Sequence, residues 1–468
     1  MKRIITRTAA VLGFIIIAAV CLHKVYDVLR WKDTTGGYLS SIDQLYNTDE
    51  GLIDLVFVGS SHCYSGIHPE LLWEERGIAG FDLAVSAQDR TSAYYQLKEL
   101  LKTQHPEVVV ADIYGICYEK HMVESNVYRN YLSMKVSLNS MEHIMTYPEQ
   151  ETREELLARW PVVHTRYREL KEFDFLSYEP NRIGRGSLLT WNVYAVEEGS
   201  GVNRCETVEP LSEQNREWVE NMIALSEEED FELIFMLIPW PRGDDKQAII
   251  NGFREYISEK EVTFLDLTEL AETDICAATD WADPEHLNAR GAAKLTEYLG
   301  DYITARYELP DRRNDGRYYQ WDKALERYHQ IEMLDQLAHI TDLGEYISLL
   351  TEIPEITCIL SLEGAYMDSG DRIYDCVAAF DMYYEDYMQG GKWLYRNGEL
   401  TRLCENAPES ACITDLSETD TLKVCWQGDF TDNNILIDGA AYGNTGSGLQ
   451  IILYDNIENK VILTKEIQ

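Results

Sequence analysis

Short apolar runs alternate with amphipathic segments along the first two thirds of the chain. The apolar runs cover residues 53–58, 108–113, 233–238 and 262–267, and a shorter one covers 81–84. Runs this uniformly apolar are typical of strands that are buried on both faces of a parallel sheet. Between them, residues 91–101 and 212–225 place apolar side chains at helical spacing. The pattern therefore predicts about five parallel strands joined by helices.

This alternation predicts a doubly wound, flavodoxin-like α/β domain over residues 50–307, with helices on both faces of the sheet. One segment, about 116–210, interrupts the alternation and is rich in Tyr, Trp and Arg. It is too long for a plain loop, so we expect it to contain helices of its own. Because it leaves the carboxyl edge of a strand, where ligands bind in such folds, we expect it to cap the site.

The pattern changes after residue 308. A polar, turn-prone linker covers 311–316, and a helical stretch covers 321–340. Short strand candidates follow at 357–362, 422–426, 435–437 and 449–454, with Asn397-Gly398 and Asp438-Gly439 as turns. The sequence therefore predicts a separate β-rich accessory domain over residues 341–468.

The N-terminus combines basic residues with an apolar run. Lys2, Arg3 and Arg7 precede the apolar residues 9–22. A basic flank before an apolar run marks the cytoplasmic side of a membrane. We therefore expect residues 1–30 to form an uncleaved, single-pass signal anchor that holds the body outside the cytoplasm at the cell membrane. A cleaved signal peptide and a buried soluble helix are the alternatives.

The charge balance limits the choice of partners. The chain has 81 acidic and 41 basic residues, for a formal net charge of −40. Such a surface repels phosphate backbones, so we expect no nucleic-acid partner. The histidines and cysteines lack metal-ligand spacing, so we expect no metal ion and no cofactor.

Two short segments contain residues that are suited to nucleophilic chemistry. The run at 53–58 leads into Gly59, Ser60 and Ser61, which would place a serine at the mouth of the sheet. Far along the chain, Asp283 and His286 lie three residues apart just before a predicted helix. A serine needs a base beside it, and a carboxylate can orient a histidine for that task. Taken singly, the first segment could be a helix cap, and the second could be a surface cap or a pair of metal ligands.

Taken together, the two segments resemble the SGNH (GDSL-type) hydrolase superfamily over about residues 54–303. The resemblance implies that Ser61 is the nucleophile and that Asp283 and His286 complete its triad. The second block of the family aligns with residues 81–88, which makes Ser86 or Ala87 the expected backbone oxyanion donor. The third block falls at 112–115, where Tyr114 stands in place of the Asn of the family.

Because its third block departs from the family pattern, the chain more closely resembles the anchored branch of this superfamily, which acts on cell-envelope polymers. This resemblance implies an esterase or O-acyltransferase that moves an acyl group, expected to be acetyl, on a polysaccharide or teichoic-type polymer. A membrane-bound O-acyltransferase is an expected partner. His62, Trp240 and Arg242 are candidate substrate contacts from their places near the mouth of the sheet. For these residues the alternatives are a packed or capping histidine, turn packing and a solvated charge. The alternatives are an inactive carbohydrate-binding protein and a scaffold that hands on an acyl chain.

The C-terminal segments 356–362 and 448–455 resemble the interleukin-like EMT-inducer fold. Related domains accompany sugar-processing enzymes, so the resemblance implies a carbohydrate-binding accessory domain over about residues 343–468. An accessory β-rich domain with no binding role is the alternative.

Overall fold

The structure is a computed structural model that describes residues 2–29, 40–118, 124–159, 164–168, 170, 185–268, 273–363, 373–374, 377–404, 411–417, 420–425, 435–442, 448–457 and 459–467. The chain divides into two compact units, Met1–Leu325 and Glu326–Gln468. Each unit is described by itself.

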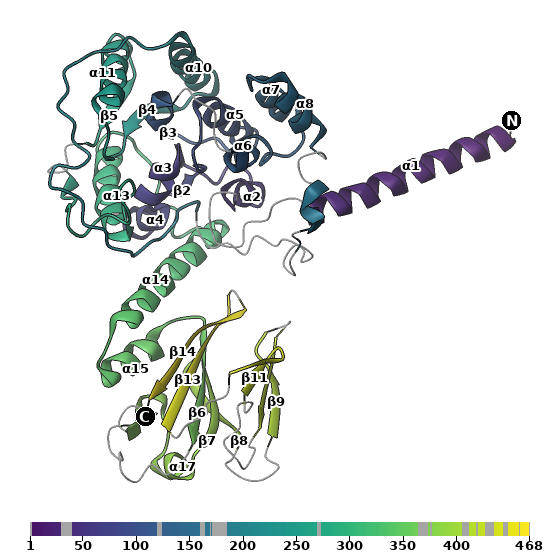
Figure 1. The fold of residues 1–468 in the computed structure, drawn as a ribbon, viewed down its shortest axis with the longest axis vertical. Coiled ribbons are helices and arrows are strands. Elements are labelled where there is room, and N and C mark those ends of the chain that lie inside the picture. The colour runs from purple at the N-terminus through teal and green to yellow at the C-terminus, as the bar shows by residue number, and fades with distance from the viewer. Residues whose placement is uncertain are drawn as a thin grey trace. The chain divides into compact units, whose positions relative to one another are not determined.

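The first unit is built on a five-stranded parallel sheet with the order β2-β1-β3-β4-β5 (Figure 1). The strands are β1 (Leu55–Val58), β2 (Gly80–Asp82), β3 (Val108–Asp112), β4 (Glu232–Leu237) and β5 (Thr263–Asp266). All five were predicted within a few residues. β1 to β4 are almost entirely buried, whereas β5, at the edge of the sheet, is mostly half-buried. The α/β class and the parallel sheet are therefore confirmed.

Apolar clusters cover both faces of this sheet. One cluster joins the sheet to α5 (Arg90–Leu100), α10 (Glu213–Glu229) and α11 (Asp244–Ser258). The other joins it to α3 (Ser61–Gly66), α4 (Pro69–Arg76) and α13 (Ala289–Thr304). Alternate residues of each strand belong to the two clusters, as in β1, where Val56 faces the first and Phe57 faces the second. The sheet is thus buried on both sides, and its carboxyl edge is left for the site.

The predicted insertion contains helices in its first half. After η1 (Tyr114–Cys117) come α6 (Glu124–Tyr131), α7 (Leu138–Met145), α8 (Gln150–Ala158) and η2 (His164–Arg168). Of these, α6 and α7 attach to α5. Gln96 Nε2 donates to the Asn130 carbonyl at 3.2 Å, and Asn139 Nδ2 donates to the Tyr95 carbonyl at 2.9 Å. The second half, from residue 185, is extended, and the Leu188 N–H donates to the Tyr64 carbonyl of α3 at 2.8 Å. The extended part of the insertion, rather than its helices, therefore lies beside α3, which begins at Ser61.

The N-terminal segment requires a correction. It forms α1 (Lys2–Leu29), and α2 (Ser40–Tyr46) follows. None of the helices in the described part of the chain combines the length and the apolar character that crossing a membrane requires. The expected single-pass anchor and the membrane location inferred from it are therefore not supported. The physical reason is that the apolar run at 9–22 is shorter than the roughly 20 residues that a spanning helix needs.

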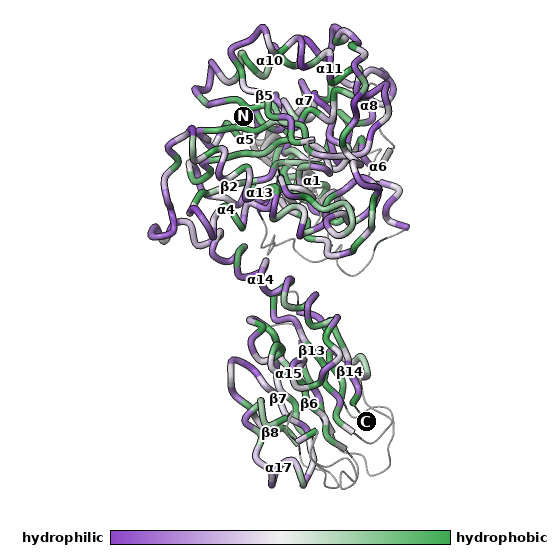
Figure 2. The backbone as a smooth tube through the Cα atoms, turned by 90° about the vertical axis from the view of Figure 1, so that its left-hand side faces the viewer, coloured by the Kyte–Doolittle hydropathy of each residue, from purple (hydrophilic) through white to green (hydrophobic). Residues whose placement is uncertain are grey.

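The second unit contains two antiparallel sheets, with the orders β14-β13-β6-β7-β8 and β12-β11-β10-β9. In Figure 2 the tube is green along the central strands of the first of these sheets, which are almost entirely buried. The strands are β6 (Ile356–Glu363), β7 (Gly391–Arg396), β8 (Glu399–Cys404), β9 (Ala411–Asp415), β10 (Thr421–Cys425), β11 (Ile435–Ile437), β12 (Ala440–Ala441), β13 (Gly448–Asp455) and β14 (Lys460–Ile467).

One helix spans the boundary between the units, and further helices belong to the second unit. After η4 (Gly316–Tyr318), α14 (Tyr319–His339) begins in the first unit and ends in the second. Within the second unit follow α15 (Leu343–Glu352), η6 (Ala378–Phe380) and α17 (Tyr384–Gln389). The predicted turn at Asn397-Gly398 joins β7 to β8, with positive φ at both residues, as a tight hairpin requires.

Candidate active site

The nucleophile segment is a tight connection between β1 and α3. Ser60 is the N-cap of α3, and its carbonyl accepts from the Cys63 N–H at 3.0 Å. Gly59 lies against the end of β3, and a Cβ at this position would meet the Asp112 Cβ at 2.6 Å. Only glycine therefore lets β1 approach β3 this closely while the chain turns into the helix. The turn places Ser61 at the first helical position, partly exposed at the carboxyl edge of the sheet.

Asp283 and His286 lie on a narrow loop. An antiparallel bridge pairs Trp281 with Leu287, and the Ala282 N–H donates to the His286 carbonyl at 2.9 Å. Within the loop, Asp283 Oδ1 accepts the backbone N–H groups of Glu285 and His286 at 2.8 and 2.9 Å. The carboxylate therefore closes the turn that carries the imidazole, and the two side chains are held in one rigid unit.

The structure brings Ser61, His286 and Asp283 together in a continuous hydrogen-bonded chain. His286 Nε2 lies 2.8 Å from Ser61 Oγ, and His286 Nδ1 lies 3.0 Å from Asp283 Oδ2. Burial acts to raise the pKa of Asp283, but the Glu285 N–H and His286 hydrogen bonds outweigh it and lower that pKa below its ordinary value. Asp283 is therefore an anion at neutral pH. This is the arrangement in which a histidine can take a proton from a serine hydroxyl.

Asn288 anchors the loop to its surroundings. Its Oδ1 caps α13 by accepting the Arg290 and Gly291 N–H groups. Its Nδ2 donates to the carbonyls of Thr279, Trp281 and Asn192, at 2.7, 3.2 and 3.0 Å. One side chain therefore connects the Asp283–His286 loop, the helix behind it and the extended end of the insertion.

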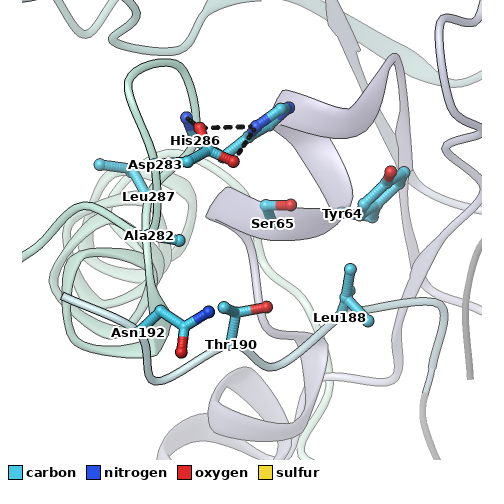
Figure 3. Close-up of a pocket in the computed structure, with 9 residues that line it drawn as sticks. All are labelled: Tyr64, Ser65, Leu188, Thr190, Asn192, Ala282, Asp283, His286 and Leu287. Atoms are coloured by element: carbon cyan, nitrogen blue, oxygen red, sulfur yellow. Dashed lines mark hydrogen bonds and ion pairs between the residues drawn. The ribbon is translucent and has the colours of Figure 1, made fainter. Parts of the chain in front are cut away.

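A pocket of about 280 Å³ opens beside His286 and Asp283 (Figure 3). In the close-up, α3 supplies one wall, the 282–287 loop supplies another, and the extended insertion segment supplies the third. Its lining residues are Tyr64, Ser65, Leu188, Thr190, Asn192, Ala282, Asp283, His286 and Leu287. The lining is mostly uncharged and mixes hydroxyl and amide groups with aliphatic ones. Such a surface suits a neutral, polar group more than an anion.

The expected oxyanion donors lie in a turn beside Gly59. The Val85 N–H donates to the Gly59 carbonyl at 3.1 Å, and the Gln88 N–H closes the turn on the Val85 carbonyl at 2.9 Å. Ser86 and Ala87 are the central residues of this turn. Ala87 has a φ of +48°, a conformation that glycine adopts without strain. The turn thus keeps the backbone shape of a glycine position without the glycine.

Tyr114 belongs to an aromatic group with His62 and Trp240. Its backbone N–H is directed to Asp112 Oδ1 at 3.2 Å. Its ring packs against His62, with centroids 4.1 Å apart, and meets Trp240 edge-on at 4.9 Å. His62 and Trp240 are buried, at 3% and 2% exposed. The predicted substrate contacts at these positions are thus a packed aromatic group behind His286.

Arg242 is turned toward the backbone. Its guanidinium donates to the carbonyls of Gly201 and Trp240, at 2.6 and 3.1 Å, and to Gln247 Oε1 at 2.6 Å. Burial lowers its pKa relative to the ordinary arginine value. These bonds hold the end of the insertion against Trp240, which accounts for Arg242 without a ligand.

Asp112 is a site residue that was not singled out from the sequence. It ends β3, is buried, and accepts from Ser60 Oγ at 3.4 Å. Burial raises its pKa to about 7, although the N–H groups of Tyr114 and Ser60 oppose that shift. Its position after an apolar run at the carboxyl edge was the available signal. In the parts of the chain that the structure describes, no cluster of His, Cys, Asp or Glu is arranged to hold a metal ion.

Comparisons with known proteins add little to this geometry. No family model matches the chain, and no curated protein matches it. A solved structure from Parabacteroides merdae, described as a candidate GDSL-like lipase, aligns at 12% identity over 55% of this chain and 99% of its own. The TM-score of this alignment is 0.19, so it carries no argument about fold or activity.

Proposed function

We propose that this protein is a serine esterase or O-acyltransferase of the SGNH type, with Ser61 as nucleophile, His286 as its base and Asp283 as the carboxylate that orients His286. The observation that carries the proposal is the unbroken chain from Ser61 Oγ through both ring nitrogens of His286 to Asp283. The flavodoxin-like, doubly wound arrangement is part of the proposal, and the strand order β2-β1-β3-β4-β5 supports it.

The proposed reaction has two steps. In the first, Ser61 Oγ attacks the carbonyl carbon of an ester while His286 Nε2 takes the hydroxyl proton and then passes it to the leaving alkoxide. In the second, water or a sugar hydroxyl gives its proton to His286 and attacks the acyl-enzyme. The bond from the acyl carbon to Ser61 Oγ then breaks, and Oγ takes the proton from His286. The ionised Asp283 stabilises the imidazolium in both steps. The backbone near Ser86 and Ala87 is proposed to bind the developing oxyanion.

The proposed substrate is an acylated polysaccharide, with acetyl as the acyl group. The pocket beside His286 is mostly uncharged and polar, with Asp283 as its carboxylate, which supports a neutral, hydroxyl-bearing ligand. The β-rich second unit is proposed to bind carbohydrate, on the strength of its resemblance alone. A membrane-bound O-acyltransferase remains a proposed partner on the same ground.

Covalent labelling tests the proposal. The purified protein is treated with a fluorophosphonate, and the modified residue is located by mass spectrometry. We expect an adduct on Ser61, none in Ser61→Ala, and wild-type labelling in Ser258→Ala, which removes an exposed hydroxyl far along the chain. Ser60 should stay unmodified because it is 1% exposed and hydrogen-bonded to Asp112.

An adduct on Ser60, or on neither serine, would reject Ser61 as nucleophile. A protein that does not label but binds acetylated polysaccharide would instead be the carbohydrate-binding alternative. That alternative is favoured by one observation, the Tyr114 that stands where the family places an amide donor.

A further inference from the structure

Ser60 and Ser61 belong to two different hydrogen-bonded chains. Ser61 leads to His286 and Asp283, as described above. Ser60 Oγ lies 3.2 Å from His62 Nδ1 and donates to Asp112 Oδ2 at 3.4 Å. Two neighbouring serines thus join two hydrogen-bonded groups, with His286 in the middle of the first and Ser60 in the middle of the second. Only the first group contributes side chains to the pocket lining.

The two groups are in contact through their histidine rings. The ring of His62 stacks on the ring of His286, with centroids 4.9 Å apart and an interplanar angle of 28°. On its other sides His62 contacts Tyr114 and Trp240, at centroid distances of 4.1 and 5.8 Å. A buried ring that is fixed by a hydrogen bond and two aromatic neighbours has little freedom to tilt.

The charge state of His62 suits contact with a base. Burial, and secondarily the proximity of His286, lowers the pKa of His62 well below its ordinary value, so the ring is neutral. A neutral ring can lie against His286 without repelling the positive charge that His286 gains when it takes the Ser61 proton. A protonated ring in the same place would oppose that charge.

We propose that His62 is a positioning residue, a fixed ring held by Ser60 and Asp112 that sets the plane of the His286 imidazole. The plane matters because His286 must direct Nε2 at Ser61 while Nδ1 points at Asp283. This inference rests on the proposed function, since it assigns a role in the same reaction. It also gives a role to the buried Ser60 and Asp112, which lie outside the Ser61–His286–Asp283 chain.

Three substitutions of His62 separate the effect of its ring from the effect of its hydrogen bond. His62→Phe keeps a ring face, His62→Asn keeps a donor near the Nδ1 position, and His62→Ala removes both. We expect the fluorophosphonate acylation rate to fall about 10-fold to 100-fold in His62→Ala and His62→Asn, as for a small misplacement of a catalytic group. His62→Phe should be clearly faster than both.

His143 provides a matched control. It is also a buried histidine, stacked on Tyr131 at 4.1 Å and hydrogen-bonded to Ser92 Oγ at 3.0 Å, but it lies outside the site. His143→Phe should lower the melting temperature by an amount similar to His62→Phe and leave the acylation rate unchanged. A rate loss that simply follows lost stability would appear in both variants.

A second measurement needs no chemistry at Ser61. The hydrogen-bonded Nδ1 proton of His286 should give a downfield proton resonance, assigned by its loss in His286→Ala. We expect this resonance in wild type, His62→Phe and His143→Phe, and its broadening or loss in His62→Ala and His62→Asn. If the resonance behaves in this way but Ser61 never labels, the proposed function fails and the positioning role stands.

Two results would overturn the inference alone. In the first, wild type labels on Ser61 and all three His62 variants label at the wild-type rate. In the second, His62→Phe is as slow as His62→Ala, which would mean that a ring face does not support His286.

Discussion

The hydroxyl of Ser61 differs from that of Ser60 in what it can reach. Ser60 caps α3 and bonds to a buried carboxyl, whereas Ser61 is one residue further round the turn and faces His286. A single residue of register therefore separates a helix cap from a proposed nucleophile. The same logic separates the two partners of Ser61, because His286 would move the proton while Asp283 would only hold His286 in place.

At this scale we expect His286→Ala and Asp283→Asn to differ. His286→Ala should lower the turnover of a small acetyl ester by about 10³-fold or more, because no other group takes the Ser61 proton. Asp283→Asn should leave measurable turnover, because the neighbouring backbone still holds the loop. Thermal melting of each variant is the control. Unchanged turnover in His286→Ala would reject the triad, and a collapsed melting temperature would mean that the pair is structural.

Among the elements, the loop between β5 and α13 depends on one amide. The acceptor oxygen of Asn288 caps α13, and its donor nitrogen holds three carbonyls. These two functions act on different elements: the cap stabilises the helix, and the donor fixes the loop that carries Asp283 and His286. Substitutions that remove one function at a time should therefore have different effects.

We expect Asn288→Asp to keep the cap but lose the bonds to Thr279, Trp281 and Asn192. It should lower activity and also destabilise the loop, because Asn288 is buried and a carboxylate oxygen in place of its Nδ2 would repel these carbonyls. Asn288→Ala loses both functions and should destabilise the protein by about 2 kcal/mol or more, since a cap and buried carbonyls lose their partners. Urea unfolding and ester turnover are the measurements. The idea fails if Asn288→Asp has full activity.

How much of this could be read from the sequence depends on the range of each contact. The strands of the parallel sheet were predictable because each is a local run of buried apolar residues. The Asp283–His286 pair was predictable because both residues lie within one turn. The bond from Ser60 to Asp112 was not, since it requires the knowledge that β1 and β3 are neighbours. The anchor prediction failed because a short apolar run does not determine what a helix can span.

For the whole molecule, the important feature is the division between two compact units. The division falls within α14, between Leu325 and Glu326. On one side of it, Trp321 is fully buried in the first unit, where its Nε1 donates to the Gly80 carbonyl at 2.9 Å. On the other side, Arg327 forms a buried ion pair with Asp455 at 2.8 Å within the second unit. Residues less than two helical turns apart thus stabilise different cores.

We therefore expect two calorimetric unfolding transitions. Trp321→Ala should lower the melting midpoint of the first unit alone. The free energy of unfolding of that unit should fall by the several kcal/mol typical of losing a large buried ring. Arg327→Ala should lower that of the second unit alone, because it leaves the buried Asp455 without this partner. Loss of fluorophosphonate labelling during heating identifies the transition of the first unit. A single transition that both substitutions shift equally would contradict this division.

The separation of the reacting groups along the chain has a consequence for biosynthesis. Ser61 and the His286 that faces it are 225 residues apart. A ribosome that has made Ser61, the proposed nucleophile, must therefore translate most of the first unit before His286, its proposed base, exists. During that time we expect Ser61 to behave as an ordinary hydroxyl that does not attack esters. A serine-directed probe added to stalled nascent chains would stay unreactive until residues beyond α13 had left the exit tunnel, and its onset would report when the sheet closes.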